Sequence, residues 1–280
     1  MHDAYRIDKK GNGSFDDVIC GWRFLRTYDV DVNVLCTIHA ANAGHPLAVY
    51  RRFFRDELKA RYIQLIPVVE RATERTIALA NLGWGGLKGT DRPLYKQEGN
   101  LVTERTVTAE QFGEFLIGVF DEWVRRDVGD VYVITFDVAL GSWMRQHNAC
   151  IVSPTCGGTL TMEHNGDVYS CDHYVEPDHL LGNVNDTPLG TLVTSEKQRR
   201  FGQSKYDTLP KFCKECPVLF ACYGECPRNR FIKTPHGEDG LNYLCAGYKA
   251  FFTHIAPSTK TMAGLIRQGR FADEIMQLSK

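Results

Sequence analysis

The cysteines are the residues of this sequence whose number and spacing point most directly to chemistry. Of the ten cysteines, Cys20 and Cys36 stand apart in the first half, and the other eight lie together further along: Cys150, Cys156, Cys171, Cys213, Cys216, Cys222, Cys226 and Cys245. Clustered thiols are typical of metal ligands, because thiolates bind zinc and iron-sulfur clusters. Eight thiolates make two complete sets of four ligands.

The first clustered cysteines flank a predicted β-hairpin. Cys156 is followed after nine residues by Gly166, and after four more by Cys171. Strand-type residues alternate on both sides of Asn165 and Gly166, which is a strong hairpin signal. We therefore expect Cys156 and Cys171 to approach each other at the open end of the hairpin.

The later cysteines have the close spacing of a metal-binding loop, Cys213-x2-Cys216-x5-Cys222-x3-Cys226, with Cys245 further along. Such a loop can wrap a metal while a distant cysteine completes the ligand shell. Structural zinc takes four thiolates at similar spacings, so the pattern alone does not separate zinc from iron-sulfur. A third interpretation is that these cysteines are buried as small apolar residues. The nine histidines complete no ligand set better than the cysteines do, so we assign them no metal.

The elements before the cysteines alternate between helix and strand. Apolar residues at helical spacing predict helices over 15–28 and 45–58, and β-rich runs predict strands over 30–38 and 62–69. This order implies a parallel α/β layer. Cys20 and Cys36 fall in the first helix and the first strand, so we interpret both as buried packing residues.

The middle of the chain predicts a long excursion followed by further regular structure. Residues 70–108 are rich in glycine and charge, which is typical of a long loop beyond a strand end. An amphipathic helix is then predicted over 109–128, a short strand over 131–136 and another helix over 137–147.

The overall charge and hydropathy exclude two classes of protein. With 33 Lys and Arg against 34 Asp and Glu, the net charge of -1 lacks the basic excess of a phosphate-backbone binder, so we expect no nucleic-acid partner. The sequence has neither a signal peptide nor an apolar run as long as the roughly 18 residues of a membrane span. We expect a cytoplasmic protein without a membrane partner.

The eight cysteines in this order resemble a known family. From Cys156 to Cys245 they resemble the SPASM pattern of radical S-adenosylmethionine (SAM) enzymes, and with Cys150 they resemble anaerobic sulfatase-maturating enzymes. Further stretches that resemble that family cover nearly the whole chain: 2–6, 33–35, 62–67, 169–174 and 241–245.

The resemblance implies an α/β fold built from the C-terminal part of a radical SAM barrel and a SPASM domain. We expect a partial (β/α)6 barrel over 1–70 and an insertion loop with connecting helices over 71–149. A SPASM iron-sulfur domain with a β-hairpin and helices would follow over 150–250, and a C-terminal helical segment over 251–280.

The resemblance also implies two auxiliary [4Fe-4S] clusters. It assigns one to Cys150, Cys156, Cys171 and Cys226, and the other to Cys213, Cys216, Cys222 and Cys245. Because Cys226 would then serve the first cluster and Cys222 the second, one loop would join both sites. The spacing alone would have grouped Cys226 with its sequence neighbours.

The family reaction oxidises a sulfatase cysteine or serine to Cα-formylglycine with SAM as cofactor. The resemblance implies a sulfatase polypeptide as substrate and an electron donor such as flavodoxin or ferredoxin. Asp172 matches the family's proton acceptor. Arg6 matches a SAM-binding arginine, whose guanidinium suits the carboxylate of SAM. Val69, at the end of the last recognisable barrel strand, matches an apolar position that contacts SAM.

The sequence departs from the family in one motif. Members carry a CxxxCxxC loop that holds the SAM-cleaving [4Fe-4S] cluster, and the ligands of that cluster are absent here. We therefore expect a truncated chain, corresponding to the C-terminal part of such an enzyme, and do not expect catalysis by this chain alone. The alternatives are a noncatalytic thiolate-metal module, with zinc or Fe-S, that binds a peptide, and a different peptide-modifying radical SAM/SPASM enzyme.

Overall fold

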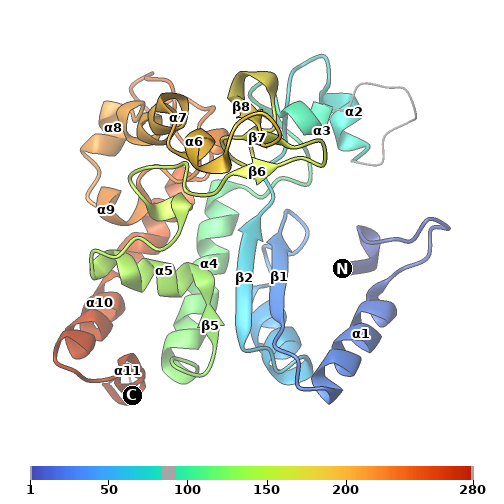
Figure 1. Cartoon of the computed structure of the whole chain (residues 1–280). Helices are drawn as coiled ribbons and strands as arrows, with labels where there is room; N and C mark the ends of the chain where they lie inside the picture. Colours follow the sequence, from blue (N-terminus) through green and yellow to red (C-terminus); the bar gives the residue numbers. More distant parts are fainter. Residues whose placement is uncertain (1, 84–92, 279–280) are drawn as a thin grey trace. The chain divides into compact units, whose positions relative to one another are not determined.

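The computed structural model describes residues 2–83 and 93–278, so part of the predicted excursion over 70–108 lies outside the described residues. The chain forms two compact units (Figure 1). Unit 1 comprises Met1–Leu140 and Thr253–Lys280, and unit 2 comprises Gly141–Phe252. Within the described ranges, no helix combines the length and the apolar character that a membrane span needs.

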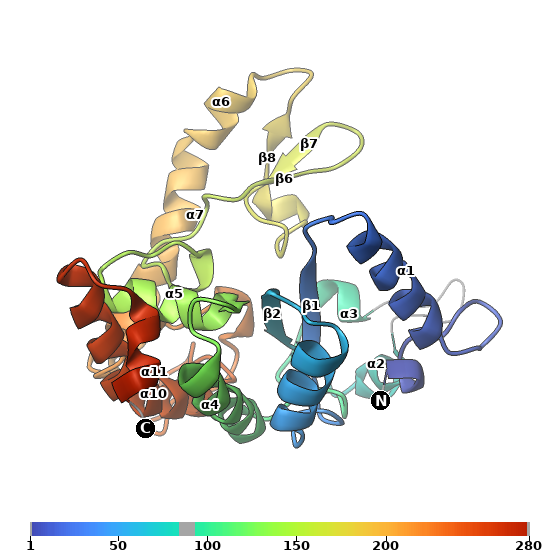
Figure 2. The same cartoon turned by 90° about the horizontal axis from the view of Figure 1, so that it is seen from below.

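A parallel sheet organises unit 1. Strands β1 (Asn33–Ile38) and β2 (Tyr62–Pro67) pair along their whole length, and β5 (Tyr132–Val133) pairs with the start of β2, which gives the order β1-β2-β5. Helix α1 (Phe15–Thr27) precedes β1, and the helical segment η2 (Ala48–Glu57) connects β1 to β2 (Figure 2). The predicted parallel α/β layer is therefore confirmed, although η2 has the wider π-helical form rather than the α form.

Helix α4 (Ala109–Arg126) supplies much of the core of unit 1. It begins with a capping box, in which the Thr108 side chain accepts from the Gln111 amide and the Gln111 side chain accepts from the Thr108 amide. Its buried face carries large apolar side chains, including Phe112, Phe115, Leu116, Val119, Phe120 and Trp123. The helix predicted over 109–128 is confirmed.

The predicted boundary between the next strand and helix is wrong. The strand expected over 131–136 is reduced to the two residues of β5, and α5 (Ile134–Trp143) begins inside the predicted strand. Phe136 packs against Phe120 and Trp123 from the helix, at ring-centroid distances of 5.2 Å and 5.3 Å. A short apolar run fits either a strand or a buried helix, so periodicity could not place this boundary.

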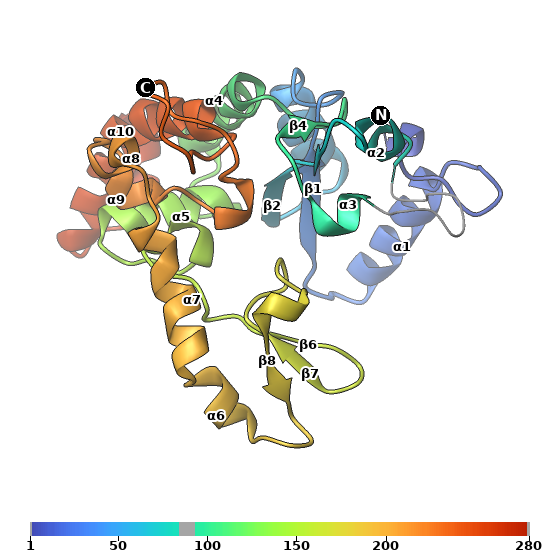
Figure 3. The ribbon, with the colours of Figure 1, turned by 90° about the horizontal axis from the view of Figure 1, so that it is seen from above.

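Unit 2 contains a small antiparallel sheet followed by two consecutive helices. Strands β6 (Thr161–Met162), β7 (Asp167–Tyr169) and β8 (Leu180–Asn183) form the sheet, and helices α6 (Leu189–Val193) and α7 (Glu196–Asp207) follow it (Figure 3). Gly166 adopts φ 90° in the turn between β6 and β7, which requires glycine's conformational freedom. The predicted hairpin is confirmed.

The remaining elements are short, apart from α10. In unit 1 they are η1 (His2–Ala4), β3 (Arg71–Ala72), α2 (Ile77–Asn81), α3 (Pro93–Lys96), β4 (Leu101–Val102), η6 (Ala272–Glu274) and α11 (Ile275–Leu278). In unit 2 they are η3 (Cys150–Val152), η4 (Pro177–His179), α8 (Lys211–Lys214), α9 (Leu219–Cys222) and η5 (Pro227–Asn229). Helix α10 (Cys245–Arg267) begins in unit 2 and continues into unit 1. The finer domain boundaries expected from the sequence stay a prediction.

Candidate metal centres

All eight clustered cysteines lie in unit 2, and all ten cysteines of the chain are free thiols. In the first set, the ionisation of one cysteine affects the pKa of another. This set consists of Cys150, Cys156, Cys171 and Cys226. Burial raises the pKa of the Cys226 thiol to about 12, with further contributions from Glu225, Cys156 and Cys171. Burial raises the pKa of Cys171 to about 12, with further contributions from Asp172 and Cys150. Cys150 also contributes to the raised pKa of Cys156, after the larger effect of burial.

The other four thiols form a second neighbourhood: Cys213, Cys216, Cys222 and Cys245. Burial raises the pKa of Cys222 to about 12, and Cys245 and Cys213 add to the shift. Burial raises the pKa of Cys245 to about 11, with contributions from Cys213 and Cys216. Charges shift a pKa in this way only over short distances. The pKa shifts therefore relate Cys226 to Cys156 and Cys171, and Cys222 and Cys245 to Cys213, while the division of the eight cysteines into two ligand sets stays a prediction.

Helix α7 positions the backbone that carries the first set. Its buried residues Gln198, Gly202 and Lys205 share one face of the helix. Gln198 Nε2 donates to the carbonyls of Gly157 at 2.9 Å and Ser170 at 3.1 Å, and so links the residues next to Cys156 and Cys171. The Cys156 amide donates to the Gly202 carbonyl at 3.0 Å. A Cβ on Gly202 would lie 2.5 Å from the Cys156 carbonyl oxygen, so only glycine permits this approach.

Lys205 completes that face with a buried positive charge. Its side chain is 1% exposed, and Nζ donates to the carbonyls of Cys150 and, at 3.1 Å, Ile151. Burial lowers the pKa of Lys205, and the nearby Cys156, Glu225 and Cys150 oppose this effect. Among the described residues, no carboxylate lies within ion-pair distance of Lys205.

A strained three-residue linker joins the two thiol sets between Cys222 and Cys226. Tyr223, Gly224 and Glu225 have φ values of 44°, 67° and 51°, and left-handed backbone is costly for the two residues other than glycine. Arg230 holds this conformation, because its guanidinium donates to the carbonyls of all three residues at 2.6 to 3.2 Å. Asn242 Nδ2 donates to the Gly224 carbonyl at 3.3 Å and to Glu225 Oε2 at 2.7 Å.

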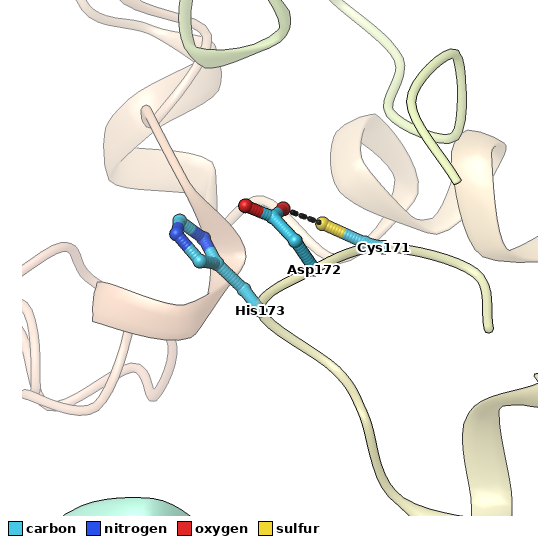
Figure 4. A group of neighbouring side chains, drawn as sticks. All are labelled: Cys171, Asp172 and His173. Atoms are coloured by element: carbon cyan, nitrogen blue, oxygen red, sulfur yellow. Dashed lines mark hydrogen bonds between the residues drawn. The ribbon is translucent and has the colours of Figure 1, made fainter. Parts of the chain in front are cut away.

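Asp172 lies directly beside a thiol of the first set (Figure 4). Cys171 Sγ donates to Asp172 Oδ1 at 3.2 Å, and the His173 side chain lies on the other side of the carboxylate. His173 Nδ1 lies 3.4 Å from Cys226 Sγ, so this histidine contacts the thiol set although the sequence assigned it no role. The ligand atoms of Cys171, Asp172 and His173 all lie within 4.8 Å of one another. Asp172 and His173 are exposed.

Arg228 holds the chain that follows these residues. Its Nη1 donates to the His173 carbonyl at 2.5 Å and to Glu176 Oε1 at 3.0 Å, and its guanidinium lies 5.5 Å from the Tyr174 ring centroid. Because Arg228 follows Cys226 by two residues, this contact connects the Cys171 segment to the Cys226 segment.

The other residues singled out from the sequence lie in unit 1. Arg6 is exposed on the N-terminal segment, and Val69 is half-buried just beyond the end of β2. Cys20 is exposed, so the expectation of a buried packing residue is wrong there; it occupies a solvent-facing position of α1. Cys36 is partly buried in β1, and burial raises its pKa to about 12.

The residues that sequence reasoning missed are polar ones that hold the cysteine backbone: Gln198, Gly202, Lys205, Arg230 and Asn242. From its sequence alone, α7 is expected to be exposed, because most of its side chains are charged or polar and such side chains usually face solvent. Gln198, Gly202 and Lys205 do have the spacing of one helix face. Because none of the three is a large apolar residue, this spacing does not indicate a buried face.

The donor chemistry of unit 2 fits iron-sulfur clusters. Each set offers four thiols, which is the full ligand complement of a [4Fe-4S] cluster. A buried ammonium bound only to carbonyls is costly unless an anion lies nearby, and a cluster held by four thiolates is such an anion. Four thiolates around zinc are also anionic, and the iron and sulfide content of the protein distinguishes the two kinds of site.

Comparison with known proteins gives one family match and several close relatives. Residues 154–217 match SPASM, an iron-sulfur cluster-binding domain. A serine-type anaerobic sulfatase-maturating enzyme of Bacteroides thetaiotaomicron is 44% identical over 260 residues, which cover 92% of this chain and 59% of that protein. A cysteine-type enzyme of Clostridium perfringens is 26% identical over 270 residues, covering 95% of this chain and 65% of its own length. The chain thus spans less than two thirds of these relatives.

Solved structures agree with this result. Native anSMEcpe with bound AdoMet and Cp18Cys peptide superposes with a TM-score of 0.75 at 25% identity, over 95% of this chain and 66% of that chain. Native anSMEcpe with bound AdoMet gives a TM-score of 0.75 over 94% of this chain and 65% of that chain. The expected fold class is confirmed.

Proposed function

Because this chain is related over most of its length to the anaerobic sulfatase-maturating enzymes, we propose that it serves the same reaction. The substrate would be a sulfatase polypeptide, and its active-site serine or cysteine would be oxidised to Cα-formylglycine. The observation that carries this proposal is the pair of four-thiol sets in unit 2, joined by one linker, within a chain 44% identical to a serine-type enzyme.

We assign one [4Fe-4S] cluster to each thiol set. Cys150, Cys156, Cys171 and Cys226 would hold the first, and Cys213, Cys216, Cys222 and Cys245 the second. These clusters would supply the path by which the second electron of the oxidation leaves the substrate. A flavodoxin- or ferredoxin-type protein would exchange electrons with the enzyme. The ten free thiols suit a reducing compartment, which supports a cytoplasmic location.

Asp172 is the residue of this chain that we assign to proton transfer. Its carboxylate lies 3.2 Å from Cys171 Sγ, a ligand of the first cluster in this proposal. There it would accept the thiol or hydroxyl proton of the target side chain while the electron leaves through the adjacent cluster. Arg228 fixes the segment after Asp172, and an oriented base contributes more than a mobile one.

Two residues of unit 1 are assigned to SAM. The Arg6 guanidinium would bind the carboxylate of SAM, and Val69 would contact SAM beyond the C-terminal end of β2. Parallel barrels place ligands at this end of their strands. When bound, SAM and its own cluster supply the radical that removes hydrogen from the target Cβ. This sequence contains no CxxxCxxC motif to hold that cluster.

The experiment that tests the proposal is a peptide assay under anaerobic conditions. Reconstituted protein is incubated with SAM, dithionite and a sulfatase peptide carrying serine or cysteine, together with the part of the Bacteroides relative that this chain does not match. We expect mass spectrometry to detect the formylglycine aldehyde, and Asp172→Asn to lower its rate about 10²- to 10⁴-fold, as for loss of a general base. Asp186→Asn, the same change at an exposed position beyond β8, is a matched control. Full activity of Asp172→Asn would contradict the assignment, and a peptide left unmodified by the wild-type protein would contradict the function.

A further inference from the structure

Two cations, the buried Lys205 and the partly buried Arg230, lie beside the thiol sets, and among the described residues neither has a bonded carboxylate partner. Lys205 donates only to the carbonyls of Cys150 and Ile151. Arg230 donates to the carbonyl of Lys205 at 2.6 Å and to those of Tyr223, Gly224 and Glu225. Within the described part of the chain, no ion pair involves either cation. The carbonyl oxygens accept hydrogen bonds from Lys205 and Arg230, but they carry no net charge and so do not balance the two positive charges.

The nearest carboxylate is already engaged elsewhere. Glu225 is 7% exposed, and its Oε2 accepts from Asn242 Nδ2 at 2.7 Å and from Asn229 Nδ2 at 3.2 Å. Glu225 therefore acts on Lys205 and Arg230 across a distance rather than as a bonded partner. One buried carboxylate thus stands against the buried Lys205 and the partly buried Arg230, so positive charge is in excess beside the thiol sets.

The two cations differ in the thiols that they face. Lys205 Nζ donates to the carbonyl of Cys150, and the thiols that act on its pKa are Cys156 and Cys150, both of the first set. Those that act on Arg230 belong to both sets: Cys213 and Cys222 of the second, and Cys156 of the first. Arg230 also binds the linker between Cys222 and Cys226, so it occupies the position between the sets.

We propose that Lys205 and Arg230 are positioning residues that serve as built-in counter-charges of the clusters, Lys205 for the first cluster and Arg230 for both. This inference rests on the proposed function, because it needs anionic clusters in the two sites. A four-thiolate cluster gains a further negative charge on reduction, and nearby positive charge stabilises the reduced form. The two cations thereby raise the reduction potentials and ease electron transfer from the substrate into the first cluster.

The test is a redox titration of the reconstituted holoprotein, followed by electron paramagnetic resonance. Cys216→Ala and Cys156→Ala backgrounds isolate the first and second clusters, respectively. Lys205→Gln keeps a donor for the carbonyls but removes the charge, and Arg230→Lys keeps the charge but loses the planar fork. Arg230→Gln removes the charge. Arg200→Gln, on the exposed side of the same helix, is the control.

We expect Lys205→Gln to shift the potential of the first cluster to more negative values and to leave the second unchanged. Arg230→Gln should shift both clusters in the same direction and further than Arg230→Lys, which keeps the charge but loses hydrogen bonds to the linker. Arg200→Gln should leave both close to wild type. The spectra and the iron content of each variant show whether its clusters are assembled.

Three results would overturn the counter-charge proposal. The first is unchanged potentials in Lys205→Gln and Arg230→Gln, with both clusters present. The second is a shift of both clusters by Lys205→Gln. The third is loss of clusters from Arg230→Lys to the same extent as from Arg230→Gln, because the hydrogen bonds and not the charge would then be essential. Wild-type protein that contains zinc and little sulfide would instead contradict the proposed function itself.

Discussion

At the scale of single residues, the two thiol sets are distinguished by which cysteines share a neighbourhood. Cys226 directly follows the linker that starts after Cys222, yet after burial and Glu225 it is Cys156 and Cys171 that raise the pKa of its thiol. Between Cys222 and Cys226, Tyr223 and Glu225 adopt left-handed backbone conformations. A single strained linker therefore separates the two centres, and each centre should respond to mutation on its own.

This independence can be measured with one substitution in each set. Cys156→Ala should remove about four iron atoms and as many sulfides per chain, and Cys216→Ala should remove a similar number from the other site, since each cubane needs its thiolates. Cys20→Ala, at an exposed position outside both sets, is the matched control and should leave the iron content unchanged. Loss of all iron from either single variant would argue against two separate clusters.

The sequence predicts the cysteines as ligands because thiols at such spacing have few other uses. The residues that hold them could not be predicted in this way. Lys205 and Arg230 are of types that are usually exposed, and the burial of Lys205 depends on contacts with backbone far away in the sequence, such as the Cys150 carbonyl. Cys20 shows the reverse error, since a small apolar residue in an amphipathic helix was expected inside and lies outside.

At the scale of elements, helix α7 is the scaffold of the first site. Gly202 is the point of closest approach, because a Cβ there would meet the Cys156 carbonyl oxygen, which belongs to the backbone and cannot move aside cheaply. Gly202→Ala should therefore displace Cys156, lower the iron content of the first site and destabilise the protein by about 1–3 kcal/mol, as overpacking does.

The matched control for this substitution is Gly190→Ala. Gly190 lies in α6, and a Cβ there meets nothing within 4 Å. Replacing it should be neutral or slightly stabilising, because alanine favours the helix. Iron analysis and thermal unfolding of both variants make the comparison. Normal iron and stability in Gly202→Ala would contradict the scaffold role of α7.

Helix α5 carries a carboxylate whose ionisation should affect stability. Burial raises the pKa of Asp137 from 3.8 to about 7, so folding favours the protonated form. The folded state binds a proton that the unfolded chain has released, and stability must fall as the pH rises between these two values. Asp137→Asn should reduce this loss, raising the Tm more at about pH 8 than at about pH 4. A Tm difference between Asp137→Asn and the wild type that does not depend on pH would refute this prediction. Asp130→Asn, at an exposed position, is the control.

Elements with a hydrophobic pattern were predictable, and polar or short ones were not. The sheet strands β1 and β2 and the helices α1 and α4 follow from periodicity, because one face of each packs in the core of unit 1. The π-helical form of η2 and the early start of α5 depend on tertiary packing, such as that of Phe136 against Phe120. The buried face of α7 consists of Gln198, Gly202 and Lys205. The sequence of this helix therefore has no hydrophobic periodicity from which its contact with the cysteine backbone could be predicted.

At the scale of the whole molecule, the chain combines a unit with a conventional core and a unit built around thiols. Unit 1 buries the aromatic face of α4, whereas one core cluster of unit 2 consists of Leu209, Leu241 and a thiol, Cys213. Metal binding couples to folding where ligands form part of the core. The identity and the number of the bound metals are therefore the central claim of this account.

The most direct test is to purify the protein anaerobically, reconstitute it, and measure iron, acid-labile sulfide and zinc per chain. The account predicts about eight iron atoms with matching sulfide and little zinc, because two cubanes each take four thiolates. Mostly zinc with little sulfide would contradict it, since zinc has no redox chemistry and would leave unit 2 with a structural role alone.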